Sequence, residues 1–167
     1  LPRAPRLRIR VGDAREVLSS LREQTRDVII RDAFAESVTP PHLMTVEFTE
    51  QVRRVLASGG LYIANVGDRR DLQSARAEIA TVAEVFEQVE LIADPAMFKG
   101  RRSGNIIVVA GDGPLPESAA LQRRLRADPE PSRLLTGREA SDFIRHAKPL
   151  RDGAGPAVGR PESTQIV

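Results

Sequence analysis

Two aspartates that follow predicted strands are the residues of this sequence best placed to do chemistry. Asp13 follows a stretch in which apolar and charged residues alternate, and Asp32 follows a run of β-branched residues. A carboxylate at a strand end can accept a hydrogen bond from an adenine amino group or a ribose hydroxyl, or take a proton from an amine. Asp is also favoured in turns and at helix N-termini, so structural capping is the competing interpretation.

A twisted α/β sheet is the architecture that would bring these strand ends together. Strands and helices alternate along the chain, and ligands of open α/β sheets lie at the carboxyl ends of the strands. Hydrophobic periodicity predicts strands at residues 7–11, 27–32, 61–66, 88–92 and 105–110, and helices at residues 14–24, 42–57, 72–86, 114–126 and 137–147. The run Val28-Ile29-Ile30 is typical of a strand buried in a parallel sheet, whereas the alternation at 7–11 indicates an edge strand.

Local signals predict how several of these elements end and pair. Ser58-Gly59-Gly60 is predicted to stop the preceding helix. The connection between the strands at 88–92 and 105–110 is too short for a crossover helix, so we expect an antiparallel pair. After Pro149 the chain is rich in Gly, Pro and polar residues, which predicts a partial α/β domain at residues 1–148 and a flexible tail at 149–167.

Composition excludes several classes of function. The chain has 167 residues, no Cys and a formal charge of +2. Without Cys there are no disulfides, thiolate metal sites or cysteine nucleophiles. His42 and His146 have no metal-ligand companions at familiar spacing, so no metal site is predicted. Basic residues are interspersed with acidic ones, and no apolar run is long enough to span a membrane, so we expect a cytoplasmic protein that binds neither nucleic acid nor membrane.

Three segments, taken in order, resemble the spermidine synthase and S-adenosylmethionine-dependent methyltransferase-fold family. They are Val-Gly-Asp-Ala-Arg-Glu-Val-Leu at 11–18, Asp-Val-Ile-Ile-Arg-Asp-Ala-Phe at 27–34, and the segment from Glu47 to Asn65 that contains Ala-Ser-Gly-Gly-Leu-Tyr-Ile. The resemblance runs from about residue 7 to residue 110. It implies a Rossmann-like methyltransferase-type sheet, mostly parallel with an antiparallel C-terminal strand pair, that lacks the first two strand-helix units of the family.

The resemblance also implies roles for individual residues. Gly12, Asp13 and Ala14 match the family's Gly-Asp segment at the adenine end of the nucleotide. Asp32 matches the first carboxylate of an Asp-x-x-Asp loop that helps to deprotonate the attacking amine, and Phe34 is placed either to stack on the adenine or to fill the core. The second carboxylate of that loop falls at Ala35, which cannot bind a polyamine ammonium.

The family's glycine-rich turn and its ribose-binding acid have no counterpart in this sequence, which leaves two hypotheses. The first is an aminopropyl- or methyltransferase domain, partial and with weak or no activity alone, that takes S-adenosylmethionine or its decarboxylated form and an unidentified acceptor, with Asp32 as the catalytic residue. The second is a non-catalytic interaction module that dimerises through an exposed sheet edge.

Overall fold

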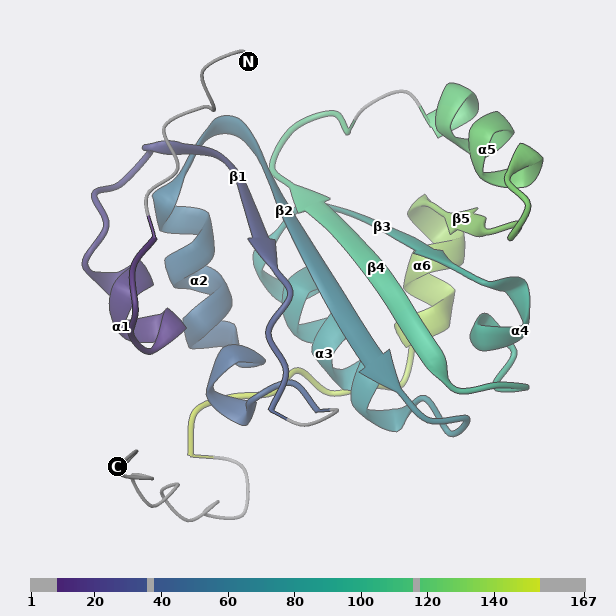
Figure 1. Ribbon diagram of the computed structural model, residues 1–167, viewed down its shortest axis with the longest axis horizontal. Coiled ribbons are helices and arrows are strands. Elements are labelled where there is room, and N and C mark those ends of the chain that lie inside the picture. Colours follow the sequence, from purple (N-terminus) through teal and green to yellow (C-terminus); the bar gives the residue numbers. More distant parts are fainter. Residues whose placement is uncertain (1–8, 36–37, 116–117, 154–167) are drawn as a thin grey trace.

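The computed structural model describes residues 9–35, 38–115 and 118–153, whose centre is a five-stranded sheet with the order β1-β2-β4-β3-β5 (Figure 1). β1 (Arg26–Arg31) pairs in parallel with β2 (Leu56–Asp68). β4 (Gly104–Gly111) lies between β2 and β3 (Gln88–Ala93) and is antiparallel to both, so that β1, β2 and β3 run in one direction. The short β5 (Arg133–Leu135) forms the other edge. The α/β class and the antiparallel pair are therefore confirmed.

Helices connect the strands and pack mainly on one side of the sheet. They are α1 (Ala14–Ser19), the 3-10 helix η1 (Pro41–Leu43), α2 (Val46–Val55), α3 (Gln73–Val85), α4 (Pro95–Phe98), α5 (Ser118–Ala127) and α6 (Gly137–Ile144). The Thr45 side chain caps α2 by accepting a hydrogen bond from the Phe48 N–H at 3.3 Å. The first turn of α3 is capped from the end of β2, where Asp68 accepts from the Ala75 N–H at 2.7 Å.

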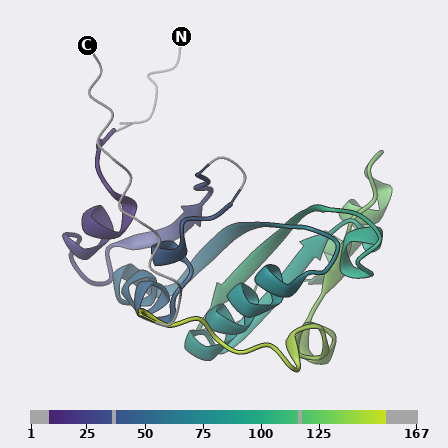
Figure 2. The ribbon, with the colours of Figure 1, turned by 90° about the horizontal axis from the view of Figure 1, so that it is seen from below.

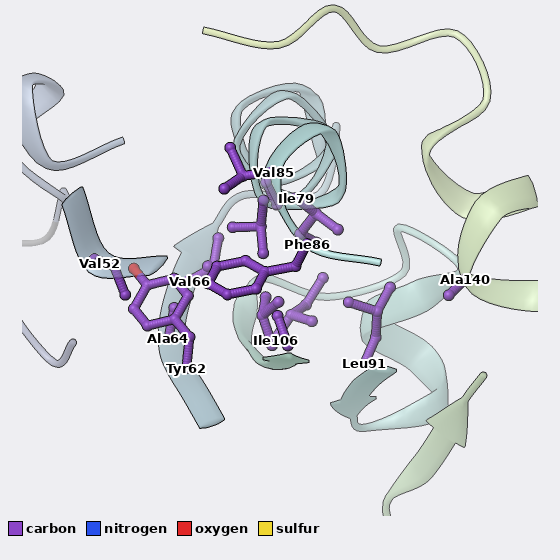
Figure 3. Packing of buried hydrophobic residues seen from close by; sticks show 14 of the residues in the cluster. Val52, Tyr62, Ala64, Val66, Ile79, Val85, Phe86, Leu91, Ile106 and Ala140 are labelled. Atoms are coloured by element: carbon purple, nitrogen blue, oxygen red, sulfur yellow. The ribbon is translucent and has the colours of Figure 1, made fainter. Parts of the chain in front are cut away.

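The side of the sheet that faces α2, α3 and α6, here called the covered face, carries the hydrophobic core (Figures 2 and 3). Tyr62, Ala64 and Val66 of β2 alternate onto this face and are almost fully buried. The Tyr62 ring stacks against Phe86, with ring centroids 6.0 Å apart, below Ile79 of α3. Leu91, Ile106 and Val108 complete the layer.

The opposite side, here called the open face, has no helix across β1, β2 and β4 in the described part of the chain (Figures 1 and 2). The strand register places six apolar side chains there: Val28, Ile30, Leu61, Ile63, Ile107 and Val109. Val28 is 46% exposed and Ile30 is 67% exposed, and the other four are half-buried. Strands of this type normally have both faces covered, so the open face is an unpartnered apolar surface.

A predicted strand and a predicted helix stop are wrong. Residues 9–11 form no strand, and Ile9 and Val11 are 81% and 100% exposed; residues 7–8 lie outside the described part. Alternation alone did not suffice, because a strand also needs a neighbour to bond with, and β1 is the edge strand instead. Ser58-Gly59-Gly60 does not stop a helix: α2 ends at Val55 and β2 begins directly at Leu56.

Residues 150–152 are held against the helices. The Leu150 N–H donates to the Thr81 hydroxyl at 2.8 Å, and the Leu150 carbonyl accepts from the Val46 N–H at 2.8 Å. The Asp152 carboxylate forms a bidentate pair with Arg15, at 2.8 and 2.5 Å. We call residues 150–152 the C-terminal strap. The sequence predicted a flexible tail at residues 149–167; these contacts show that residues 150–152 are instead held in the fold, and residues 154–167 lie outside the described part.

Candidate functional site

Asp32 and Asn65 meet where the parallel pairing between β1 and β2 ends. Asp32 directly follows β1, and the Asn65 side-chain amide donates to Asp32 Oδ1 at 3.0 Å. Asn65 lies between Ala64 and Val66 of the covered face, so strand alternation directs its side chain to the open face. In the described residues no donor reaches Asp32 Oδ2, and the buried Asn65 Oδ1 has no hydrogen-bond partner. The pair therefore leaves one carboxylate oxygen of the exposed Asp32 without a donor and one buried amide oxygen of Asn65 without a partner.

The segment after Asp32 carries the predicted stacking residue. Phe34 is 36% exposed, so the core does not enclose its ring. Ala35 and Val38 exchange backbone hydrogen bonds, with N···O distances of 2.8 and 3.1 Å. This tight return brings the chain to Thr39, which is 3% exposed, and then into η1.

Asp13 is the N-cap of α1, as the capping interpretation predicts. Its Oδ1 accepts from the N–H groups of Arg15 and Glu16 at 2.9 and 3.1 Å, and its Oδ2 lies 2.8 Å from His42 Nε2. Burial raises the pKa of Asp13, but the hydrogen bonds from Glu16, His42 and Arg15 outweigh it and hold the pKa below its usual value. The side chain is 39% exposed, so one lone pair of Oδ2 remains available to a ligand.

Gly12 and Ala14 flank Asp13 at the start of α1. Gly12 is exposed, so its backbone is accessible to solvent. A Cβ at this position would lie 3.3 Å from Cγ2 of Val17, so a larger residue would fit tightly. Within the described ranges no hydrogen bond joins the group 12–14 to Asp32 directly. The link runs through η1, because His42 contacts Asp13 and the chain from Asp32 leads into η1.

Sequence reasoning missed the most heavily bonded side chain next to this site. Arg31 is 5% exposed and forms an ion pair with Glu78 of α3, which is 3% exposed. It also donates from Nε to the Tyr62 hydroxyl at 3.1 Å and from Nη1 to Thr39 Oγ1 at 3.0 Å. Burial raises the pKa of Glu78 to about 7 against the opposing effect of Arg31, and burial raises the pKa of Tyr62 to about 12.

In the described chain, Asp13 and Asp32 are exposed and line no enclosed pocket. Three hollows of about 500, 550 and 740 Å³ lie elsewhere, and neither Asp13 nor Asp32 lines any of them. Among the described residues no group of three acidic or His side chains could hold a metal ion. No helix in that part of the chain is long and apolar enough to cross a membrane.

Comparisons with known proteins agree with this geometry. No family model matches the chain. The polyamine aminopropyltransferase of Vibrio vulnificus is 33% identical over 122 residues, which are 72% of this chain and 38% of that protein. The crystal structure of a probable spermidine synthase from Corynebacterium glutamicum is 44% identical, with a TM-score of 0.84, and the match covers 96% of this chain and 59% of that one.

More distant structures share the fold. Spermidine synthase from Thermotoga maritima is 16% identical, with a TM-score of 0.54, over 85% of this chain and 47% of that one. Human methyltransferase-like protein 13 is 18% identical, with a TM-score of 0.54, over 88% and 63%. This chain thus spans between about two fifths and three fifths of its nearer relatives' length. By sequence and structure this chain is thus a homologue of a partial segment of spermidine synthases, and it shares its α/β fold with a methyltransferase-like protein.

Proposed function

We propose that this chain forms part of the active site of a transferase that uses an S-adenosyl nucleotide, of the aminopropyl- or methyltransferase type. By itself we expect it to have weak or no activity. The observation that carries the proposal is the Asp32–Asn65 pair, which lies at the carboxyl end of β1, where its parallel pairing with β2 ends. Open α/β sheets bind ligands at such ends, and the two nearer relatives are named a polyamine aminopropyltransferase and a probable spermidine synthase.

Asp32 is the proposed catalytic residue. When bound, the nucleotide supplies a carbon activated by an adjacent positively charged sulfur. Asp32 Oδ2 accepts a hydrogen bond from the acceptor amine and takes its proton as the nitrogen forms the new bond, while the C–S bond breaks and the sulfur keeps its electron pair. Asn65 fixes Asp32 Oδ1, which leaves Oδ2 to the acceptor.

The adenine end is assigned to Gly12, Asp13 and Ala14, with Phe34 placed to stack on the base. The remaining lone pair of Asp13 Oδ2 suits an adenine amino group, because amide-like and amine N–H groups donate to a carboxylate. The exposed Gly12 leaves room for close approach of a ligand.

Ala35 restricts the acceptor that this site can take. It stands where the family's loop has a second carboxylate, and a methyl side chain cannot neutralise the distal ammonium of a diamine. The aminopropyl type therefore needs another anion for the far end of the acceptor, whereas a methyl acceptor with one amine needs only Asp32.

A thermal shift experiment tests the proposal. Methylthioadenosine, S-adenosylmethionine and its decarboxylated form are added separately at about millimolar concentration, and a ligand that binds the folded state raises Tm by mass action. Asp13→Ala should abolish the shift, and Asp32→Asn should retain part of it. Asp27→Asn, an exposed change on the same strand as Arg31, serves as the control. No shift for any of the three nucleotides contradicts the proposal for this chain.

The open face favours a second candidate, an interaction module. Val28 and Ile30 are solvent-exposed on the edge strand β1, where a second chain could add to the sheet. Sedimentation velocity over a hundredfold range of concentration separates the two candidates. Concentration-dependent dimers that Ile30→Lys dissolves, with no nucleotide shift, support the module; a monomer with a nucleotide shift supports the transferase.

A further inference from the structure

A buried guanidinium sits immediately before the proposed catalytic residue. Arg31 ends β1 and turns onto the covered face, whereas Asp32, the next residue, reaches Asn65 at the open side. Arginine is rarely buried to 5% exposure without a partner for its charge, and here Glu78 of α3 supplies one.

Each nitrogen of this guanidinium donates a hydrogen bond to a different part of the fold. One Nη bonds to Glu78 in α3, Nε bonds to the Tyr62 hydroxyl in β2, and the other Nη bonds to Thr39 Oγ1. Thr39 is eight residues away in sequence, at the end of the segment that starts with Asp32. Arg31 therefore holds both the beginning of this segment, through the backbone, and its end, through Thr39.

The same hydrogen bond connects the two halves of the proposed site. Beyond Thr39 the chain enters η1, where His42 Nε2 lies 2.8 Å from Asp13 Oδ2. Fixing Thr39 against β1 and α3 sets where η1 begins, and so where His42 meets Asp13. Asp32 and Asp13 are thus held relative to each other through Arg31 and Thr39.

The chemistry of the side chain matters for this arrangement. A guanidinium donates in several fixed directions within one plane, whereas a lysine ammonium is a compact charge on a flexible stem. Stability alone does not account for a buried ion pair, because apolar residues of similar volume are often as stabilising.

We propose that Arg31 is a positioning residue that fixes Thr39 relative to Asp32, and thereby the spacing between Asp32 and Asp13. The proposal rests on the function proposed above for those two carboxylates. Arg31 touches no ligand in this scheme. It acts through Thr39, whose hydroxyl is the one group of the network that belongs to the segment.

Thr39→Val tests this with a minimal change, because it removes the hydroxyl and keeps the shape and the Arg31–Glu78 pair. Thr49→Val is the matched control: Thr49 is also buried, at 2% exposed, but its hydroxyl bonds only to the Thr45 carbonyl in α2. Amide hydrogen exchange at Ala35 and Val38 should accelerate about tenfold or more in Thr39→Val, since a buried donor loses its partner. Thr39→Ser, which restores a hydroxyl, should return most of the protection.

A second readout follows the hydrogen bond between Asn65 and Asp32. The side-chain amide signals of Asn65 should shift and exchange faster in Thr39→Val, with Thr49→Val like the wild type. Equal exchange at Ala35 and Val38 in the two Val variants, with unchanged Asn65 signals, overturns the proposal. Neither readout needs a ligand, so they decide on Arg31 even if no nucleotide binds. If methylthioadenosine does bind, its affinity should fall about tenfold in Thr39→Val and recover in Thr39→Ser.

Discussion

The two faces of the sheet differ in how completely their side chains are satisfied. On the covered face, apolar side chains reach full burial under α2, α3 and α6, and the polar groups of Arg31, Tyr62 and Glu78 bond to one another. On the open face, Val28 and Ile30 remain exposed and Asn65 Oδ1 has no partner among the described residues. The covered face thus supplies most of the stability of the fold, whereas the open face retains apolar and polar groups that have no partner in the described chain.

Breaking the buried ion pair should have the largest effect. Arg31→Met leaves the Glu78 carboxyl buried without its partner, and we expect the free energy of unfolding to fall by about 3–5 kcal/mol in urea denaturation. Arg53→Met is the control, because Arg53 is 50% exposed where it pairs with Asp112 and should lose about 0–1 kcal/mol. The double variant Arg31→Met/Glu78→Leu should recover most of the loss. An equal decrease in the free energy of unfolding for Arg31→Met and Arg53→Met would show that the buried pair stabilises the fold no more than the surface pair.

Two neighbouring isoleucines of β4 compare the faces directly. Ile106 is fully buried on the covered face, and Ile107 is half-buried on the open face. Ile106→Ala should cost about 2–5 kcal/mol, because it leaves a cavity. Ile107→Ala should cost less than half as much, because its environment is partly water. Urea denaturation of both variants measures the difference, and similar costs would mean that the open face is covered in solution.

A glutamate on the covered face should affect the pH dependence of stability more than a glutamate on the open face. Burial raises the pKa of Glu78 to about 7 from 4.5, so the folded state holds a proton that the unfolded state has released. The free energy of unfolding should therefore fall as the pH rises from about 4.5 to 7, and Glu78→Gln should flatten this slope. Burial also raises the pKa of Glu90, on the open face, where it is half-buried. Glu90→Gln should change the slope less. Thermal melts of both variants from about pH 4.5 to 7 measure the slopes, and a larger change in Glu90→Gln than in Glu78→Gln would contradict the comparison.

The smallest effect is expected at the rim of the covered face, where the C-terminal strap docks. The hydrogen bond from Arg15 holds the pKa of Asp152 below its usual value, so its contribution is present above the unfolded pKa and is lost as the pH falls through the folded one. Asp152→Asn should cost about 0.2–1 kcal/mol at pH 7, because both side chains are partly exposed. Thermal melts at pH 7 and pH 3 measure this effect. The Tm of Asp152→Asn should lie below that of the wild type at pH 7 and should approach it at pH 3.

Strands and helices with strong local patterns were predictable from the sequence. The β-branched run at Val28–Ile30 lies in β1, although β1 is an edge strand with one exposed face and not the buried strand that the run predicted. The periodic stretch at 72–86 contains α3. The start of β2 was misplaced because Gly59-Gly60 is typical of a helix C-terminus, yet Gly60 lies where a Cβ would come within 3.1 Å of two β1 carbonyls. β5, with three residues, carries too short a pattern to detect.

The site was predictable only in its strand-end positions. Asp32 was identified at such an end and Asp13 as a possible N-cap, but nothing local indicates that Asn65 bonds to Asp32, 33 residues away. Arg31 gave no signal of burial, because its charge partner Glu78 is 47 residues away on a helix. Charged residues at strand ends are usually solvated, and only tertiary packing reverses that expectation.

The C-terminal strap has a consequence for the order of events during folding. Arg15 and Asp152, which it joins, are separated by 137 residues, and Leu150 bonds to residues 46 and 81. During synthesis α1, α2 and α3 emerge from the ribosome well before residue 150 and must wait for it to complete their contacts. Closing such a long loop is slow relative to local pairing, so we expect the strap to dock after the sheet has formed.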